Sequence, residues 1–240
     1  MFCRVVLIIL GFLSAGLFAQ KENISSFNSV TLTYNFHPKW FLYMEGQLRG
    51  IEDYTYPDYY ELKGGVGFNL TGNHKPFVGV GRYVNYKARV LSREEVRLWL
   101  QDVFVLKKGS LRFENRLRAE QSWFFEPEEH VSSKRNRYRY RLNISMPLNS
   151  QKMEPGTLFA NVYDEVFFVS PMKPTFARNR VYGGFGYVVD DHFGIATGYL
   201  WQREFEAKGH RNLHYLYLAL NITIDYKAEH EKVLDFPGAD

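Results

Sequence analysis

Cysteine is almost absent from this chain, and its scarcity removes whole classes of chemistry. The single cysteine, Cys3, lies near the basic start of the sequence. It is separated from the small-residue segment at 15–19, so it does not resemble a lipoprotein acylation site. If residues 1–19 are removed, no cysteine remains. We then expect no disulfide, no thiolate nucleophile and no Cys-ligated metal.

Long apolar runs and a strong charge bias are also missing. The longest apolar run, 5–13, is too short to span a membrane, and no later stretch approaches the roughly 18 residues of a transmembrane helix. The formal net charge is +4, and without Arg4 the chain has 29 basic and 26 acidic side chains, a net +3. This small excess predicts no nucleic-acid partner. P-loop, GxSxG, HExxH and EF-hand motifs are absent, so we expect no cofactor and no metal site.

The N-terminus has the layout of a secretory signal peptide. Arg4 supplies the positive charge, 5–13 is the apolar segment, and 15–19 is a small-residue exit with cleavage expected before Gln20. We therefore expect three regions: a signal peptide at 1–19, one β-barrel domain at 20–226, and a polar C-terminal tail at 227–240. An exported chain that crosses a membrane without a long helix must cross it as strands, which points to the outer membrane and its lipid.

Charged and apolar side chains alternate most clearly in two neighbouring stretches, 111–123 and 135–147. In the first, Arg116, Arg118 and Glu120 occupy every second position, with Leu and Ala between them. A period of two indicates strands. A strand with one charged face and one apolar face separates two environments, and a wet barrel lumen and lipid are the best candidates.

Similar alternation recurs along the chain and predicts about eleven strands. Their expected ranges are 30–36, 40–49, 60–70, 77–86, 94–106, 111–123, 135–147, 157–168, 176–189, 192–205 and 212–226. Single-chain bacterial barrels normally have an even number of strands, so we expect 10 or 12 after one missed or wrongly split strand. The predicted fold is all-β, an antiparallel up-and-down β-barrel of 10–12 strands of the outer-membrane type.

The charged faces are the main candidate site. They comprise Glu95, Arg97, Arg112, Glu114, Arg116, Arg118, Glu120, Arg137, Arg139, Arg141, Glu165, Arg178 and Arg180. We expect these groups to pair across strands and fill a small lumen, since opposite charges on neighbouring strands stabilise a sheet. The alternative is that the arginine excess binds a small anionic solute, because guanidinium groups recognise phosphate and carboxylate bidentately.

Two further alternatives remain open. His130 and Ser132 lie two residues apart, a spacing that resembles the His and Ser of outer-membrane lipid hydrolases, although the flanking sequence does not. The chain could also be a soluble periplasmic barrel with its apolar faces inward, around an apolar ligand. We expect no enzymatic activity. We favour lipid outside over the soluble form because of the number and length of the strands and because aromatic residues near strand ends are typical of interfacial girdles. These residues are Trp40, Tyr60, Trp123, Phe124, Phe168 and Trp201.

Several phrases together resemble a known family. They are the YNFHPKW segment from Tyr34 to Trp40 with EGQLR after it, RLRAEQ from Arg116, RYRYRL from Arg137, Asp164-Glu165, Asn179-Arg180 with the following Tyr182-Gly183-Gly184, and Gly198-Tyr199. Through these segments the chain resembles the family of exported proteins of the Bacteroidota type that is called domain of unknown function 2490. The resemblance extends over nearly the whole mature sequence. The resemblance implies an outer-membrane barrel of unassigned activity, and it supplies no catalytic residues.

Overall fold

Each segment with a two-residue alternation forms a strand, and the strands are longer than the pattern alone indicates. The computed structural model describes residues 24–50, 57–127, 131–171, 173–207 and 209–226. The strands are β1 (Ile24–His37), β2 (Trp40–Arg49), β3 (Tyr59–Phe68), β4 (His74–Lys87), β5 (Val90–Lys108), β6 (Leu111–Glu126), β7 (Val131–Pro147), β8 (Leu158–Ser170), β9 (Phe176–Val188), β10 (Phe193–Glu206) and β11 (Gly209–Asp225). The expected signal peptide and C-terminal tail lie outside the described residues. Within those residues, no helix is long and apolar enough to cross a membrane.

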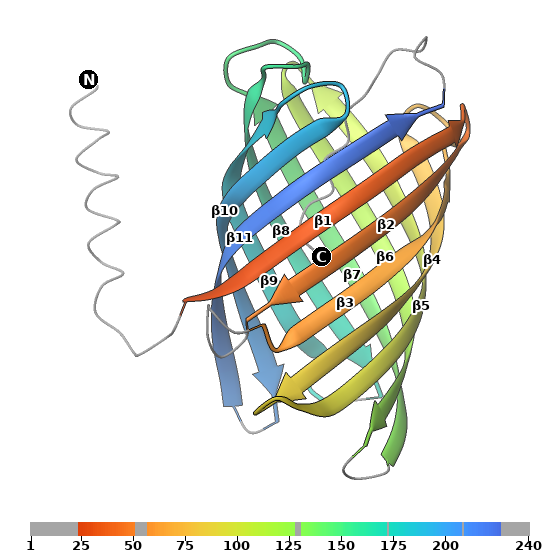
Figure 1. Cartoon of the computed structure of the whole chain (residues 1–240), viewed down its shortest axis with the longest axis vertical. Helices are drawn as coiled ribbons and strands as arrows, with labels where there is room; N and C mark the ends of the chain where they lie inside the picture. Colours follow the sequence, from red (N-terminus) through yellow and green to blue (C-terminus); the bar gives the residue numbers. More distant parts are fainter. Residues whose placement is uncertain (1–23, 51–56, 128–130, 172, 208, 227–240) are drawn as a thin grey trace, which may run out of the picture.

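The strands form one closed barrel, in which every strand pairs with its neighbours along the chain. These consecutive pairs are antiparallel, whereas β1 and β11 close the barrel by pairing in parallel, from Ile24 opposite His214 to Asn35 opposite Asp225. Figure 1 shows β1 and β11 side by side with their arrows pointing the same way. The predicted all-β, mostly antiparallel barrel is confirmed, but the even strand number is wrong. A parallel closing pair allows an odd number, and the described barrel has eleven strands.

Two expected loops are much shorter than predicted. The segment 87–93 was expected as a loop, but β4 continues to Lys87 and β5 begins at Val90. Ala88 and Arg89 form the turn with φ values of 48° and 68°, the left-handed conformation of tight hairpin turns. Such turns favour Asn and Gly, so Ala-Arg gives no signal in the sequence. The expected loop at 124–134 is likewise reduced, because β6 and β7 extend into it.

The turn between β9 and β10 follows the sequence prediction and is closed by an aspartate. The Asp190 carboxylate accepts backbone N–H groups of His192 at 2.7 Å and Phe193 at 2.8 Å. These two donors favour the ionised form and lower the pKa of Asp190 below its usual value. The short side chain thereby holds the polypeptide in the conformation that reverses its direction.

The two faces of the strands have opposite surroundings. In β5, Leu98 and Leu100 point outward with exposed fractions of 47% and 66%, whereas Arg97 and Trp99 point inward with 5% and 3%. Around the barrel, aliphatic side chains lie mainly on the outer wall, and charged side chains lie in the interior. The interior also holds aromatic and apolar side chains, among them a cluster that includes Phe27, Tyr182 and Leu200. The aliphatic faces that the soluble-barrel alternative places inside lie on the outer wall of the described strands.

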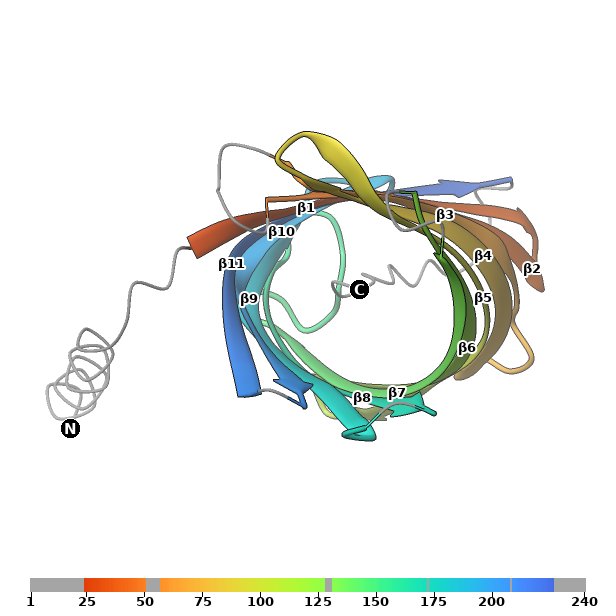
Figure 2. The ribbon, with the colours of Figure 1, turned by 90° about the horizontal axis from the view of Figure 1, so that it is seen from below.

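One end of the interior is covered by the segment that joins β7 to β8. Met153 in this segment packs against two inward-facing side chains, Phe159 and Val188. The backbone N–H of Gly156 donates to the carbonyl of Val188 at 2.8 Å, and Thr157 is buried. Viewed along the barrel, this segment lies inside the outline of the wall (Figure 2).

Aromatic rings fill part of the interior where neighbouring strands have glycine. Phe77 stacks on Phe41 and on Trp99, with ring centroids 6.1 Å apart in both pairs. A side chain at Gly79 would overlap the Trp99 ring, whereas Gly46 on the outer wall has no atom within 4 Å of the position its Cβ would occupy. The absence of side chains at Gly79 is therefore what makes room for the Trp99 ring.

We expect Gly79→Val to destabilise the barrel and Gly46→Val to leave its stability nearly unchanged. Overpacking a filled interior costs about 1–3 kcal/mol, while a valine at Gly46 points into open space. The measurement is the free energy of unfolding in urea for both variants, folded in the same detergent. Equal values for the two glycine positions would show that the aromatic stack does not need this space.

Candidate functional site in the barrel interior

The charged residues expected from the sequence all lie on inward-facing positions of five neighbouring strands, β5 to β9. We call this set the lumen charge network. It comprises Glu95, Arg97, Arg112, Glu114, Arg116, Arg118, Glu120, Arg137, Arg139, Arg141, Glu165, Arg178 and Arg180, all buried except the half-buried Arg112 and Arg178. The strand alternation places them together, because every second residue of each strand points into the barrel.

Glu120 on β6 is one centre of this network. Its carboxylate lies 2.5 Å from Nη2 of Arg137 and 2.9 Å from Nη1 of Arg139. Two further guanidinium groups, those of Arg97 and Arg118, lie at 3.6 and 3.7 Å. Glu120 is 4% exposed. Several bases share one buried acid, so the ionised carboxylate has the partners that a buried charge requires.

Glu165 on β8 is the second centre. Its Oε1 accepts from Nη2 of Arg116 at 2.7 Å, and Nη2 of Arg139 lies 2.8 Å from the same atom. Its Oε2 lies 3.7 Å from Nη1 of Arg180. Glu165 has no exposed surface. Arg139 contacts both acidic centres, so it joins them into one network.

The other acids form ion pairs with arginines on their own strand or on the adjacent strand. Glu114 lies 2.8 Å from Arg112 and 3.1 Å from Arg141. Glu95 lies 2.7 Å from Arg97. On β9 and β10, Arg178 pairs with Glu204 at 2.5 Å, and Glu204 was not among the residues singled out in the sequence. These contacts extend the network toward both rims of the barrel.

A second group of buried charges, on β2 and β3, was missed as part of the site. Glu61 lies 2.9 Å from Arg49 and 2.7 Å from Lys63, and Lys63 also lies 3.0 Å from Glu45. The signal for this group was present, since all four residues fall on the polar face of an alternating strand. The alternation of polar and apolar residues is less regular here, because glycine interrupts both strands.

The register of β6 against β7 places like charges directly opposite each other. Arg116 is opposite Arg141, and Arg118 is opposite Arg139. Like charges in these positions destabilise a sheet unless they are offset. Here the acids lie diagonally or on the next strand: Glu120 reaches Arg139 diagonally. The simple picture of an acid opposite each base therefore holds only in part.

Aromatic rings stack against many of these guanidinium groups. Phe167 lies under Arg139 at 4.7 Å and Arg180 at 5.1 Å from ring centroid to Cζ. Phe124 lies 4.6 Å from Cζ of Arg135. Phe124 is 7% exposed and faces the interior, so its expected place in an outer aromatic girdle is wrong. It falls on the inward positions of β6, and cation–π contact accounts for an aromatic ring there.

The structure describes only one of the two residues of the hydrolase alternative. Ser132 lies near the start of β7, exposed and opposite Phe125. His130 lies outside the described residues. Among the described residues, no group of three or more His, Cys, Asp or Glu side chains could hold a metal ion.

Side chains fill the middle of the interior. Glu165, Arg141 and Arg180 have exposed fractions of 2% or less although they face the lumen. These three side chains are therefore shielded from water by the residues packed around them. The ribbon in Figure 2 shows only the backbone wall that surrounds them. The arrangement can hold the barrel wall together and can present guanidinium groups to an anion.

A closed β-barrel with an apolar outer wall and a charged, filled interior is the class that the fold and the site define. The family model described as a protein of unknown function (DUF2490) matches residues 24–213. The match covers most of the chain, so the chain belongs to this family. A comparison with curated proteins finds no match.

Proposed function

We propose that this protein is an outer-membrane β-barrel whose lumen is closed by its own side chains. The observation that carries this proposal is the division of the strand faces: large apolar side chains cover the outer wall while arginine and glutamate are buried inside. In water this arrangement exposes apolar surface far beyond what a monomeric protein normally shows. In a bilayer it matches the two environments of a membrane barrel.

Aromatic residues on the outer wall support the same proposal. Trp40, Tyr60, Trp123 and Phe168 are between 37% and 43% exposed and lie toward the ends of their strands. Amphipathic rings at such positions are typical of the two membrane–water interfaces. The secretory pattern of residues 1–19 is consistent with an exported protein.

We expect the full-length protein, expressed with its signal, to fractionate with outer membranes. It should resist a high-salt wash, because its apolar wall is held by hydrocarbon rather than by ionic contacts. It should also migrate differently in detergent gels before and after boiling, because the closed barrel stays folded until heated. Recovery in the soluble periplasm would contradict the proposal.

A second function, binding or passage of a small anion, is favoured by a specific excess of buried bases. The buried bases of the strands are Arg49, Lys63, Arg97, Arg116, Arg118, Arg137, Arg139, Arg141 and Arg180, and the buried acids are Glu45, Glu61, Glu95, Glu114, Glu120 and Glu165. Buried polar atoms without a hydrogen-bond partner among the described residues include the Tyr83 and Tyr163 hydroxyl groups and Nε1 of Trp99. Such atoms normally bind water or a solute.

We expect the wild-type protein to be silent in planar bilayers, because its interior is filled. If anions do pass, Glu120→Gln should increase the preference for anions over cations, since it removes a negative charge among four guanidinium groups. Glu94→Gln, on the outer wall, is the control and should not change selectivity. A wild-type protein with steady, cation-selective current would contradict both the closed lumen and the anion alternative.

A further inference from the structure

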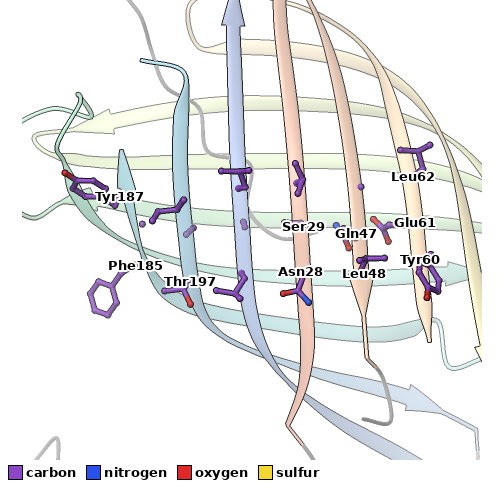
Figure 3. Close-up of a pocket in the computed structure, with 18 of the residues that line it drawn as sticks. Asn28, Ser29, Gln47, Leu48, Tyr60, Glu61, Leu62, Phe185, Tyr187 and Thr197 are labelled. Atoms are coloured by element: carbon purple, nitrogen blue, oxygen red, sulfur yellow. The ribbon is translucent and has the colours of Figure 1, made fainter. Parts of the chain in front are cut away.

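The outer wall has an apolar hollow that crosses the seam between β1 and β11. Its volume is about 1000 Å³, and it extends from the start of β8 across the seam to β4. This volume is at the upper end of the range for small-molecule sites. Figure 3 shows Phe185 of β9, Thr197 of β10, Asn28 of β1 and Leu48 of β2 lying along it. None of its lining residues belongs to the lumen charge network, although Glu61 of the group on β2 and β3 is among them.

The hollow exists because short side chains occupy outward positions between longer ones. Gly46 lies between Val30 on β1 and Leu62 on β3 in the strand register. No atom lies within 4 Å of the position that a Cβ at Gly46 would occupy. Across the seam, Asn28 is paired with Leu218, which is in turn paired with Thr197. The surrounding side chains are large and apolar, so the walls of the hollow suit a hydrocarbon.

One rim of the hollow has the residue types of a membrane interface. Arg82 lines the hollow on β4, and its side chain is 64% exposed. Its Nε donates to Glu94 at 2.6 Å. Tyr60, which also lines the hollow, packs edge-on against Tyr86 with ring centroids 5.6 Å apart. Tyrosine and arginine together are typical of the level of lipid headgroups.

We propose that this hollow binds a membrane phospholipid, with an acyl chain along the seam and its phosphate beside Arg82. The inference rests on the proposed function, because the hollow meets lipid only if the outer wall lies in a bilayer. Phospholipid is the occupant that matches both parts of the site: its chains match the apolar walls, and its phosphate matches an exposed guanidinium group. The site gives the closing seam a fixed lipid partner.

The test uses the folded full-length protein in a non-ionic detergent, incubated with dipalmitoyl phosphatidylglycerol and analysed by native mass spectrometry. We expect the wild type to retain lipid, and Gly46→Phe to retain roughly tenfold less, because the ring displaces two or more methylenes of the chain. Gly183→Phe is the matched control: Gly183 also faces outward, with only an ordinary contact to Val162 at 3.9 Å, and does not line the hollow. Arg82→Gln should weaken retention without changing the fold.

Equal lipid retention by wild type, Gly46→Phe and Gly183→Phe would overturn the inference, since the bound lipid would then be a general layer around the barrel. A wild-type dimer peak that Gly46→Phe abolishes would assign the hollow to a second copy of the chain and also overturn it. Fractionation of the same variants separates this failure from failure of the proposed function. Variants that remain in the membrane while lipid retention is unselective contradict only the lipid site.

Discussion

Glu165→Gln is expected to cost about 3–5 kcal/mol of folding free energy, because breaking a buried ion pair leaves buried charge without compensation. Glu165 has no exposed surface and contacts Arg116, Arg139 and Arg180. The amide keeps a hydrogen-bond acceptor but loses the negative charge that these three bases share. The measurement is the free energy of unfolding in urea, followed by tryptophan fluorescence in detergent.

Glu126→Gln is the matched control for this experiment. Glu126 is also a strand glutamate paired with an arginine, and it lies 2.7 Å from Arg93, but the side chains of Glu126 and Arg93 are 25% and 48% exposed. Partly exposed ion pairs contribute about 0–1 kcal/mol. If Glu165→Gln costs no more than Glu126→Gln, the interior must be wetter than its buried fractions indicate, and the closed lumen would have to be abandoned.

Leu100→Arg is expected to lower the folding free energy in lipid bilayers by about 2–4 kcal/mol, the cost of a charge near the midplane on the lipid face of a barrel. Leu100 lies in the middle of β5 and is 66% exposed on the outer wall. The measurement is the folding equilibrium in vesicles over a urea series. In a soluble protein, an exposed leucine tolerates this change within about 0.5 kcal/mol.

Leu106→Arg is the control for position across the bilayer, because Leu106 lies on the same strand and the same face as Leu100 but nearer to the strand end. Leu106 lies two residues before the end of β5, next to Lys107 and Lys108. A charge near an interface costs only about 0–1 kcal/mol. A large difference between Leu100→Arg and Leu106→Arg would therefore locate the hydrocarbon region along the strand. No difference would argue against a bilayer around this wall.

Much of the barrel could be predicted from the sequence, because a period of two directly reports strand geometry. Arg116, Arg118 and Glu120 were correctly assigned to one face, and the number of segments found by alternation equals the number of strands described. The preference for an even number was then wrong, because alternation within a strand carries no information on how the first and last strands meet. The parallel pairing of β1 with β11 depends on contacts between residues about 190 positions apart.

The details of the site were harder to predict for a physical reason. A long arginine side chain reaches the opposite, diagonal and next-strand positions equally well, so residue types on a face do not determine which acid each base contacts. Arg139 illustrates this, since it joins Glu120 and Glu165 from two different strands. Phe124 was misplaced because aromatic rings occur both at interfaces and under guanidinium groups. Its position in phase with Glu120, and the guanidinium groups of Arg93 and Arg135 over its ring, place it in the interior.

The parallel seam has a consequence for sidedness. With an odd number of strands, the start of β1 at Ile24 and the end of β11 at Asp225 lie at opposite rims of the barrel. In a barrel with an even number of strands, both would lie at the same rim. If the barrel spans the outer membrane, Ile24 and Asp225 lie on different sides of that membrane. An epitope placed directly before β1 and one placed directly after β11 would then report opposite sides of the cell envelope.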